Sequence, residues 1–237
     1  MTTPNSEMQG GEIRLLTSNS MHGVLDELLP QFEQASGVRV AVSYDPAKIM
    51  LERIAAGDSG DLAILSQPAI DSVAAQGKIT PDSRRTLARC AVGIAVRAGA
   101  PKPDIGSVEN LKRALLAAKS IAHTTSGASG IHFSGVIEKL GIANEVKAKA
   151  VKNQGGLIGT LVADGTAELA VQQIPELMAV PGVDLVGPLP QELQSISVVT
   201  VGIFNGSKQT AAAQALIDFL LQPSSARVFK AKGLEPV

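Results

Sequence analysis

Three short apolar stretches in the first 65 residues decide the fold: EIRLLTSNS at 12–20, VRVAVSYDP at 38–46 and DLAIL at 61–65. Each has the length and apolar content of a short buried strand. The residues between the first two carry apolar side chains at helical spacing, and this segment ends at Gly37. The next segment does the same, with Pro46 expected at the first helical position and Gly57 closing the helix. This alternation predicts a parallel sheet with helical crossovers.

The rest of the chain continues the alternation. We predict strands over 91–97, 120–123, 146–151, 168–172 and 197–204. We predict helices over 108–118, from the 124–130 turn to about residue 140, and over 157–163, 210–221 and 224–232. The fold class is therefore α/β, and a chain of 237 residues is long enough for two lobes of about 100 residues each.

The composition excludes several classes of protein. Apolar residues make up 45% of the chain and charged residues 18%, so the chain is not wholly disordered. The net charge of -1 and the aromatic content of 3% argue against a nucleic-acid partner, which needs a basic stripe or stacking rings. No stretch reaches the roughly 18 apolar residues of a transmembrane helix, so we expect no membrane insertion.

Motifs for cofactors and metals are missing from the sequence. It contains no G-x-G-x-x-G after a strand, no Walker A motif, no H-E-x-x-H and no G-x-S-x-G. The three histidines lack metal-ligand spacing on one helix face. Cys90 is the single cysteine and stands in an apolar run, so we expect a buried, inert thiol and no intrachain disulfide. We therefore expect neither a cofactor nor a metal.

Four polar turns lie just after a strand and just before a helix, and they are the places where chemistry is expected. They are residues 17–20, 44–48, 124–130 and 153–156. In open parallel sheets, ligands bind outside the carboxyl ends of the strands. Helix N-termini present free N–H groups and a partial positive charge, which favour anions. The turns therefore predict a site for a small anionic ligand, held by backbone N–H groups and hydroxyls.

Each turn also has an ordinary structural explanation. Residues 18–20 are common helix-capping types, and capping without a ligand would account for them. Lys48 would then be a solvated helix lysine. Ser126 and Ser129 would end a strand and cap a helix, and His132 would be a surface residue. The functional interpretation depends on four such turns occurring in one chain.

Several stretches at and around these turns carry a family resemblance. They are LTSNSM at 16–21, QASG at 34–37, IAAGDSGDLAI at 54–64, LVADGTAE at 161–168 and ALIDFLLQPSSA at 215–226. In their order and spacing they resemble the molybdate-binding-protein-like branch of the periplasmic solute-binding proteins of the type 2 fold. The resemblance implies two α/β lobes, each a mostly parallel sheet flanked by helices. Lobe I would span 12–88 plus 202–237, lobe II would span 89–201, and residues 1–11 would be a polar disordered segment.

The resemblance also implies a ligand in the cleft between the lobes. Ser20 matches the first ligand serine of the family. The second serine-bearing turn contains Ala47 here, so that hydroxyl is lost. Ser129 and Gly155 take positions that donate through the backbone, and Gln173 stands where the family has a tyrosine ligand.

The departures from the family pattern point to a different anion. Lys48 offers a point charge suited to a carboxylate or phosphate, and His132 and Gln173 add hydrogen-bonding capacity. We therefore expect a divergent pocket for a small organic acid, with molybdate or another oxyanion as second choice. The candidate ligand residues are Ser18, Asn19, Ser20, Ala47, Lys48, Ser126, Ser129, His132, Gly155 and Gln173.

Two functions follow from this pocket. The first is a monomeric solute-binding protein that closes on its anion by hinge motion and delivers it to an ABC permease. The alternative is a cytoplasmic enzyme on the same fold, such as an isomerase of a small organic acid that uses Lys48 and His132 for acid–base chemistry, or an intracellular sensor. An orphan binding module with neither permease nor activity is a third possibility. We expect a periplasmic protein if a signal peptide preceded this sequence, and a cytoplasmic one if Met1 is the native start.

Overall fold

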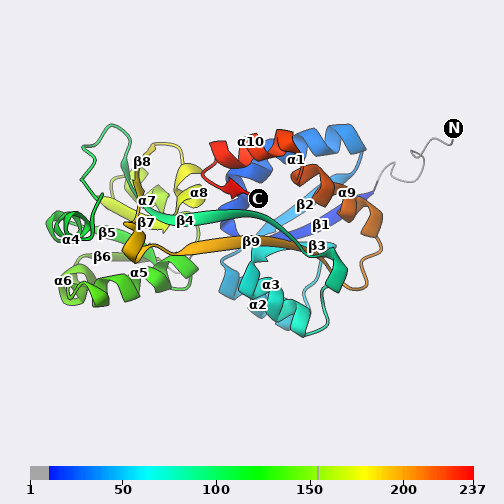
Figure 1. Ribbon diagram of the computed structural model, residues 1–237, viewed down its shortest axis with the longest axis horizontal. Helices are drawn as coiled ribbons and strands as arrows, with labels where there is room; N and C mark the ends of the chain where they lie inside the picture. The colour runs from blue at the N-terminus through cyan, green and yellow to red at the C-terminus, as the bar shows by residue number, and fades with distance from the viewer. Residues whose placement is uncertain (1–10, 154) are drawn as a thin grey trace. The chain divides into compact units, whose positions relative to one another are not determined.

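The structure, a computed structural model, describes residues 11–153 and 155–237. The chain forms two compact units, and each is an α/β assembly (Figure 1). Unit 1 comprises residues 11–89, 198–231 and 235–237, and unit 2 comprises residues 90–197 and 232–234. Our expectation of a disordered segment over residues 1–11 falls, apart from Gly11, outside the described residues.

Unit 1 begins with alternating strands and helices, as the opening stretches predict. Its elements before residue 84 are β1 (Glu12–Thr17), η1 (Asn19–Met21), α1 (His22–Ser36), β2 (Arg39–Tyr44), α2 (Ala47–Ala55), β3 (Leu62–Ser66), α3 (Gln67–Ala75) and η2 (Pro81–Ser83). Those near the end are α9 (Thr210–Leu220), α10 (Pro223–Ala231) and β10 (Glu235–Pro236). Two strands, β4 (Arg85–Arg97) and β9 (Ile196–Ile203), contribute residues to both units.

The sheet of unit 1 follows the order β2-β1-β3-β9. Strand β1 is parallel to β2 and β3, whereas β9 is antiparallel to β3, and the short β10 pairs antiparallel with β4. Thr17 is in register with both Tyr44 and Ile64. The three parallel strands therefore end at the same edge of the sheet, so the polar turns that follow them start close together.

Helices cover both faces of this sheet. Helices α1, α9 and α10 lie on one face, and α2 and α3 lie on the other (Figure 1). Helix α1 buries Leu25, Leu28 and Phe32, and it ends at Gly37, whose φ of 72° is the left-handed conformation that favours glycine. Met50 of α2 and Ile70 of α3 pack in one buried apolar cluster.

Unit 2 is built from shorter elements. They are the second part of β4, then α4 (Val108–Ala117), β5 (Ile121–Thr124), α5 (Ala128–Lys139), α6 (Ala143–Ala148), β6 (Ala150–Asn153), α7 (Gly159–Ala163), β7 (Leu169–Gln173), α8 (Ile174–Met178), β8 (Val183–Pro188), η3 (Gln191–Leu193) and the start of β9. The strand order is β4-β7-β5-β6, with β8 on β4. Strand β5 is parallel to β6 and β7, and β4 is antiparallel to β7 and β8.

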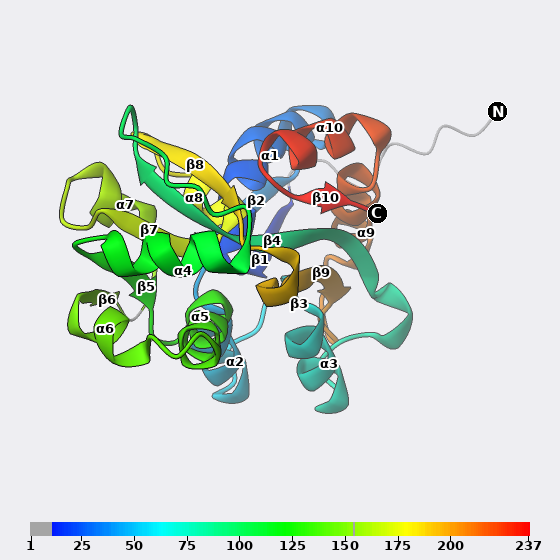
Figure 2. The same ribbon diagram turned by 60° about the vertical axis from the view of Figure 1, so that its left-hand side comes forward.

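The core of unit 2 lies between this sheet and its helices (Figure 2). Leu111 and Leu115 of α4 and Phe133 of α5 are completely buried in it. Helix α5 starts in close contact with the end of β5: a Cβ on Gly130 would lie 1.9 Å from the carbonyl oxygen of Thr124. Only glycine fits there, because any side chain would overlap the backbone of the strand.

The structure corrects two details of the predicted elements. The strand predicted over 146–151 is wrong: α6 continues to Ala148, and the strand β6 begins only at Ala150. Ile142 and Val146 have helical spacing and are both buried, a signal that the alternation of apolar residues over 146–150 concealed. Pro46 is the N-cap of α2 and not its first helical residue, because its ψ of 144° is extended.

Several elements were not predicted, among them α3, α8 and β8. Helix α3 has a recognisable start, since Ser66 precedes it and Pro68 stands in its first turn. Helix α8, which spans only five residues, and strand β8 follow β7 without a break that the sequence marks. The first half of β4 was not predicted either: Arg85 and Arg89 are exposed there, whereas Leu87, Ala88 and Cys90 are buried.

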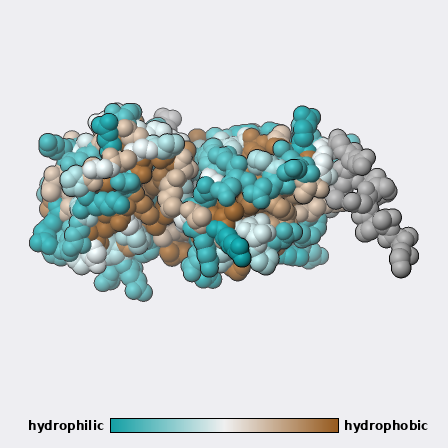
Figure 3. Space-filling model, turned by 90° about the horizontal axis from the view of Figure 1, so that it is seen from above, coloured by the Kyte–Doolittle hydropathy of each residue, from teal (hydrophilic) through white to brown (hydrophobic). Residues whose placement is uncertain are grey.

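The surface mixes polar and apolar residues. Figure 3 shows hydrophobic patches among hydrophilic residues on the face seen from above. Ile131 and Ile196 are among the exposed large apolar side chains, and single residues of this kind are normal on protein surfaces. In the described part of the chain, no helix combines the length and apolarity needed to span a bilayer.

The close approach at the start of α5 gives a stability prediction. Gly130→Ala should lower the free energy of unfolding by about 3 kcal/mol or more, because the new methyl group overlaps the strand. The matched control is Gly135→Ala in the same helix, where a Cβ meets nothing within 4 Å. It should raise the free energy of unfolding by about 0.5–1 kcal/mol, as expected for glycine replaced inside a helix. Urea denaturation measures both, and equal effects would contradict the packing argument.

Candidate functional site

The first group of candidate residues lies at the edge where β1, β2 and β3 end. We call residues 18–20 and 45–48 the unit 1 turns. The N–H of Ser18 donates to the carbonyl of Ile64 at 3.1 Å, and the N–H of Asp45 donates to the carbonyl of Thr17 at 3.1 Å. These bonds hold both turns against the ends of the strands.

The serines of this edge face each other and do not cap a helix with their side chains. The hydroxyls of Ser18 and Ser20 are 3.0 Å apart. Ser18 precedes η1 without a side-chain cap bond, and the N-cap of α1 is Met21. Asn19 and Ser20 are 7% and 3% exposed. Capping therefore does not explain why small polar side chains are buried here.

Lys48 has a different environment. It lies on α2, its side chain is 67% exposed, and its ammonium is 3.9 Å from the carboxylate of Glu52 one turn later. This arrangement is typical of a solvated helix lysine. The neighbouring cation Arg53, which the sequence analysis missed, is engaged by the carboxylates of Asp45 and Asp58 and by the hydroxyl of Ser43. These contacts hold the pKa of Arg53 above its usual value.

A stacked ring pair flanks the unit 1 turns. His22, the first residue of α1, stacks on Tyr44, the last residue of β2, with centroids 3.6 Å apart and planes at 13°. Burial lowers the pKa of His22, and Asp26 opposes this effect. Burial and then Asp26 raise the pKa of Tyr44. At neutral pH the pair is therefore a neutral imidazole on a neutral phenol, able to donate and accept hydrogen bonds.

The second group of candidates lies in unit 2, in the 124–130 turn. Ser129, the second residue of α5, is 4% exposed. Ser126 lies in the same turn and is half-buried. The hydroxyl of Thr124 is buried and has no hydrogen-bond partner among residues 11–153 and 155–237. Thr124 belongs to the predicted polar turn 124–130 but was not among the candidate ligand residues, because a threonine at the end of a strand has no distinctive pattern.

His132 connects α5 to the turn before β9. Its Nε2 lies 2.8 Å from the carbonyl oxygen of Leu193, so the imidazole donates there in the tautomer with a proton on Nε2. The ring is half-buried. This contact gives His132 a structural role within unit 2.

Two adjacent glutamines at the end of β7 organise the remaining candidates. The amide of Gln172 accepts from the N–H of Ile158 at 2.9 Å and donates to the carbonyl of Gly156 at 2.8 Å. Gln172, which the candidate set omitted, thereby holds the turn that contains Gly155 against the end of β7. Residue 154 of that turn lies outside the described residues.

Gln173 is oriented at both ends of its side-chain amide. Its oxygen accepts from the thiol of Cys90 at 3.3 Å, and its nitrogen donates to the hydroxyl of Ser197 at 3.1 Å. Cys90 is 3% exposed, as expected for a buried thiol. Burial, and then the nearby carboxyl of Glu176, raise the pKa of Cys90 to about 12, so the thiol remains a proton donor at neutral pH.

Glu176 lies in the first turn of α8, beside this glutamine pair. Burial raises its pKa to about 8, although hydrogen bonds from the backbone N–H of Gln173 and the side chain of Gln172 oppose the shift. The carboxyl is therefore largely protonated at neutral pH. A titratable group of this kind beside a polar turn is suited to proton transfer.

The structure thus gathers the candidates into two sets. Ser18, Asn19, Ser20 and Ala47 belong to the unit 1 turns. The unit 2 turns, residues 124–130, 155–158 and 172–173, contain Ser126, Ser129, Gly155 and Gln173. In the part of the chain that the structure covers, no group of three or more His, Cys, Asp or Glu side chains is placed to hold a metal ion.

The raised pKa of Glu176 predicts a pH-dependent stability. The carboxyl holds its proton up to about pH 8 in the folded protein but loses it near its usual pKa of 4.5 in the unfolded chain. The free energy of unfolding should therefore fall as the pH rises from 5 to 8. In the wild type this decrease in the free energy of unfolding should exceed about 1 kcal/mol. Glu176→Gln, which mimics the protonated carboxyl, should abolish it. Urea denaturation at several pH values measures this, and parallel curves for both proteins would contradict it.

Comparison with known proteins identifies the family. A family profile described as "Bacterial extracellular solute-binding protein" matches residues 13–235. The chain is 32% identical over 231 residues to the aconitate isomerase of a Pseudomonas species, and the matched region covers 95% of this chain and 88% of the relative. It is 28% identical over 239 residues to the molybdate-binding protein ModA of Azotobacter vinelandii, and the matched region covers 95% of this chain and 90% of the relative.

A solved structure has the same fold. The Azotobacter vinelandii periplasmic molybdate-binding protein superposes with a TM-score of 0.79 at 19% identity, covering 94% of this chain and 98% of that chain. The expected resemblance to the molybdate-binding-protein-like branch and the expected α/β periplasmic-binding fold are thereby confirmed. The chain belongs to the bacterial extracellular solute-binding protein family.

Proposed function

We propose that this protein binds a small organic acid anion at its polar turns, as the solute-binding component of an ABC transporter. The observation that carries the proposal is a buried serine in each set of turns, Ser20 and Ser129, at the carboxyl ends of parallel strands. Hydroxyls and helix N-termini at such positions favour anions without requiring a countercharge.

Lys48 no longer favours a carboxylate over an oxyanion, because its ammonium lies near the carboxylate of Glu52 on an exposed helix face. The 32% identical relative supports the choice of a carboxylate, because aconitate is a small tricarboxylate. Molybdate is kept as the second choice, because a relative of similar coverage is a molybdate-binding protein.

A second function is favoured by that isomerase relative. Isomerisation of an aconitate-type acid needs one proton removed from the CH₂ group, a shift of the double bond, and one proton returned to the far carbon. No electrons are gained or lost. Glu176 in its ionised form and the neutral imidazole of His22 are two titratable groups near the candidate turns that can accept this proton.

The two functions imply different compartments. A transport component acts outside the cytoplasm, whereas the isomerase is the function we propose for a cytoplasmic protein. In either case we propose a monomer.

Binding is tested by thermal shift and calorimetry with citrate, trans-aconitate, succinate, molybdate and sulfate. A carboxylate should raise the melting temperature most, because a ligand that binds only the folded state stabilises it. Ser20→Ala and Ser129→Ala should each lower the affinity for that carboxylate by about 10-fold or more, since each removes a hydrogen bond to a charged group. The control Ser224→Ala, on the exposed surface of α10, should bind as wild type. A larger shift with molybdate would reject the carboxylate, and unchanged affinities in both serine variants would reject the site.

Turnover is tested by NMR with cis- and trans-aconitate in D₂O. Interconversion with deuterium uptake at carbon would establish the isomerase. Glu176→Gln and His22→Asn should then show which residue is the general base, because the variant that lacks it should lose about 100-fold or more in isomerisation rate. Tight binding with no interconversion would leave transport as the function.

A further inference from the structure

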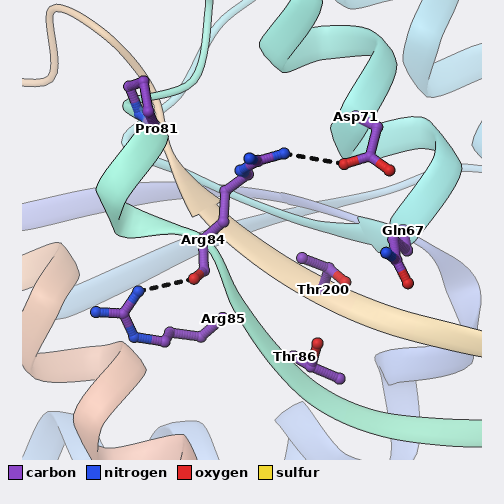
Figure 4. Close-up of a pocket in the computed structure, with 7 residues that line it drawn as sticks. All are labelled: Gln67, Asp71, Pro81, Arg84, Arg85, Thr86 and Thr200. Atoms are coloured by element: carbon purple, nitrogen blue, oxygen red, sulfur yellow. Dashed lines mark hydrogen bonds and ion pairs between the residues drawn. The ribbon is translucent and has the colours of Figure 1, made fainter.

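Unit 1 contains a cavity whose lining includes none of the candidate ligand residues. Its volume is about 370 Å³, and its lining residues are Gln67, Asp71, Pro81, Arg84, Arg85, Thr86 and Thr200 (Figure 4). They come from α3, η2 and the start of β4, and from β9. A cavity of this size is within the range of small-molecule sites.

An exposed ion pair forms one wall. Nη1 of Arg84 is 2.9 Å from Oδ1 of Asp71, and the two side chains are 41% and 52% exposed. Exposed pairs of this kind contribute little to stability, so a ligand can separate the partners at small cost. The contact uses one nitrogen and one oxygen, whereas a guanidinium carries five N–H donors and a carboxylate has two oxygens.

A buried hydroxyl forms the floor. Thr200 is 6% exposed, and its hydroxyl has no hydrogen-bond partner within the described ranges. Gln67 and Thr86 line the same cavity, and Figure 4 shows the Thr200 hydroxyl on their side of it. Buried polar groups in proteins are nearly always paired, so an unpaired one at a cavity indicates a missing partner.

The charges of the cavity select the kind of ligand. Arg85 is turned away from Thr200 and Gln67, and its Nη1 donates to the carbonyls of Asp82 and Arg84 at 2.8 Å each (Figure 4). The charges that remain on the cavity are the cation of Arg84 and the anion of Asp71, which cancel. A ligand with a negative and a positive end matches them better than a simple anion does.

We propose that this cavity binds a small zwitterion that carries a carboxylate and an ammonium group, such as an α-amino acid. The carboxylate pairs with Arg84, and the ammonium pairs with Asp71. A polar side chain of the ligand reaches the hydroxyl of Thr200. This site is separate from the proposed anion site and does not depend on it.

The test is titration calorimetry of the full chain with glycine, L-serine and L-glutamine, against acetate and ethanolamine, which carry one charge each. At least one amino acid should bind about 10-fold or more tightly than either single-charge compound. Arg84→Ala and Asp71→Asn should each lower the affinity for this amino acid by about 10-fold or more. Thr200→Val should lower the affinity for serine and glutamine more than the affinity for glycine. Arg85→Ala is the matched control and should have no effect.

Each other outcome overturns the proposal. No amino acid binding at 10 mM would reject the site, and acetate binding as tightly as the amino acids would make it a simple anion site. An effect of Arg85→Ala equal to that of Arg84→Ala would mean general charge attraction. Urea denaturation of each variant shows whether it is folded. Ser20→Ala and Ser129→Ala should leave this binding intact, so failure here is distinguishable from failure of the proposed function.

Discussion

The register of β1 with its two parallel neighbours is the constraint on which the unit 1 turns depend. Thr17 lies beside both Tyr44 and Ile64, so three strands end together and three helices start at one edge. Backbone bonds from Ser18 and Asp45 then fix the turns on the strand ends. A slip of one residue would turn the side chains of a strand to the opposite face and remove the buried position of Ser20.

In unit 2 the polar turns are also held at the ends of the strands, but by side-chain hydrogen bonds. Its turns are held by amide side chains, with Gln172 bridging to the 155–158 turn and Gln173 fixed by Cys90 and Ser197. Side-chain amides have both a donor and an acceptor, so one glutamine can hold two backbone groups of an irregular turn. Unit 1 therefore uses backbone pairing for this purpose, and unit 2 uses side chains.

Sequence patterns predicted the elements that bury a regular apolar face. Helix α1 and strand β1 were placed within a residue or two, because their apolar spacing and Gly37 are local signals. Short elements such as α6 and α8 were misassigned or missed, because five or six residues are too few to distinguish helical from alternating spacing. Among the candidate residues, the positions of Ser18, Ser20 and Ser129 could be predicted from their turns. The partners of Lys48, His132 and Glu176 could not, because they come from side-chain packing that no local pattern encodes.

The buried thiol has a chemical consequence of its own. Thiolates, and not thiols, attack disulfides and peroxides, and a pKa of about 12 leaves almost no thiolate on Cys90. Because Cys90 is the single cysteine of the chain, the folded protein has no reactive sulfur with which to cross-link or to form a sulfenic acid. Cys90 is therefore expected to remain a thiol in an oxidising compartment as in a reducing one.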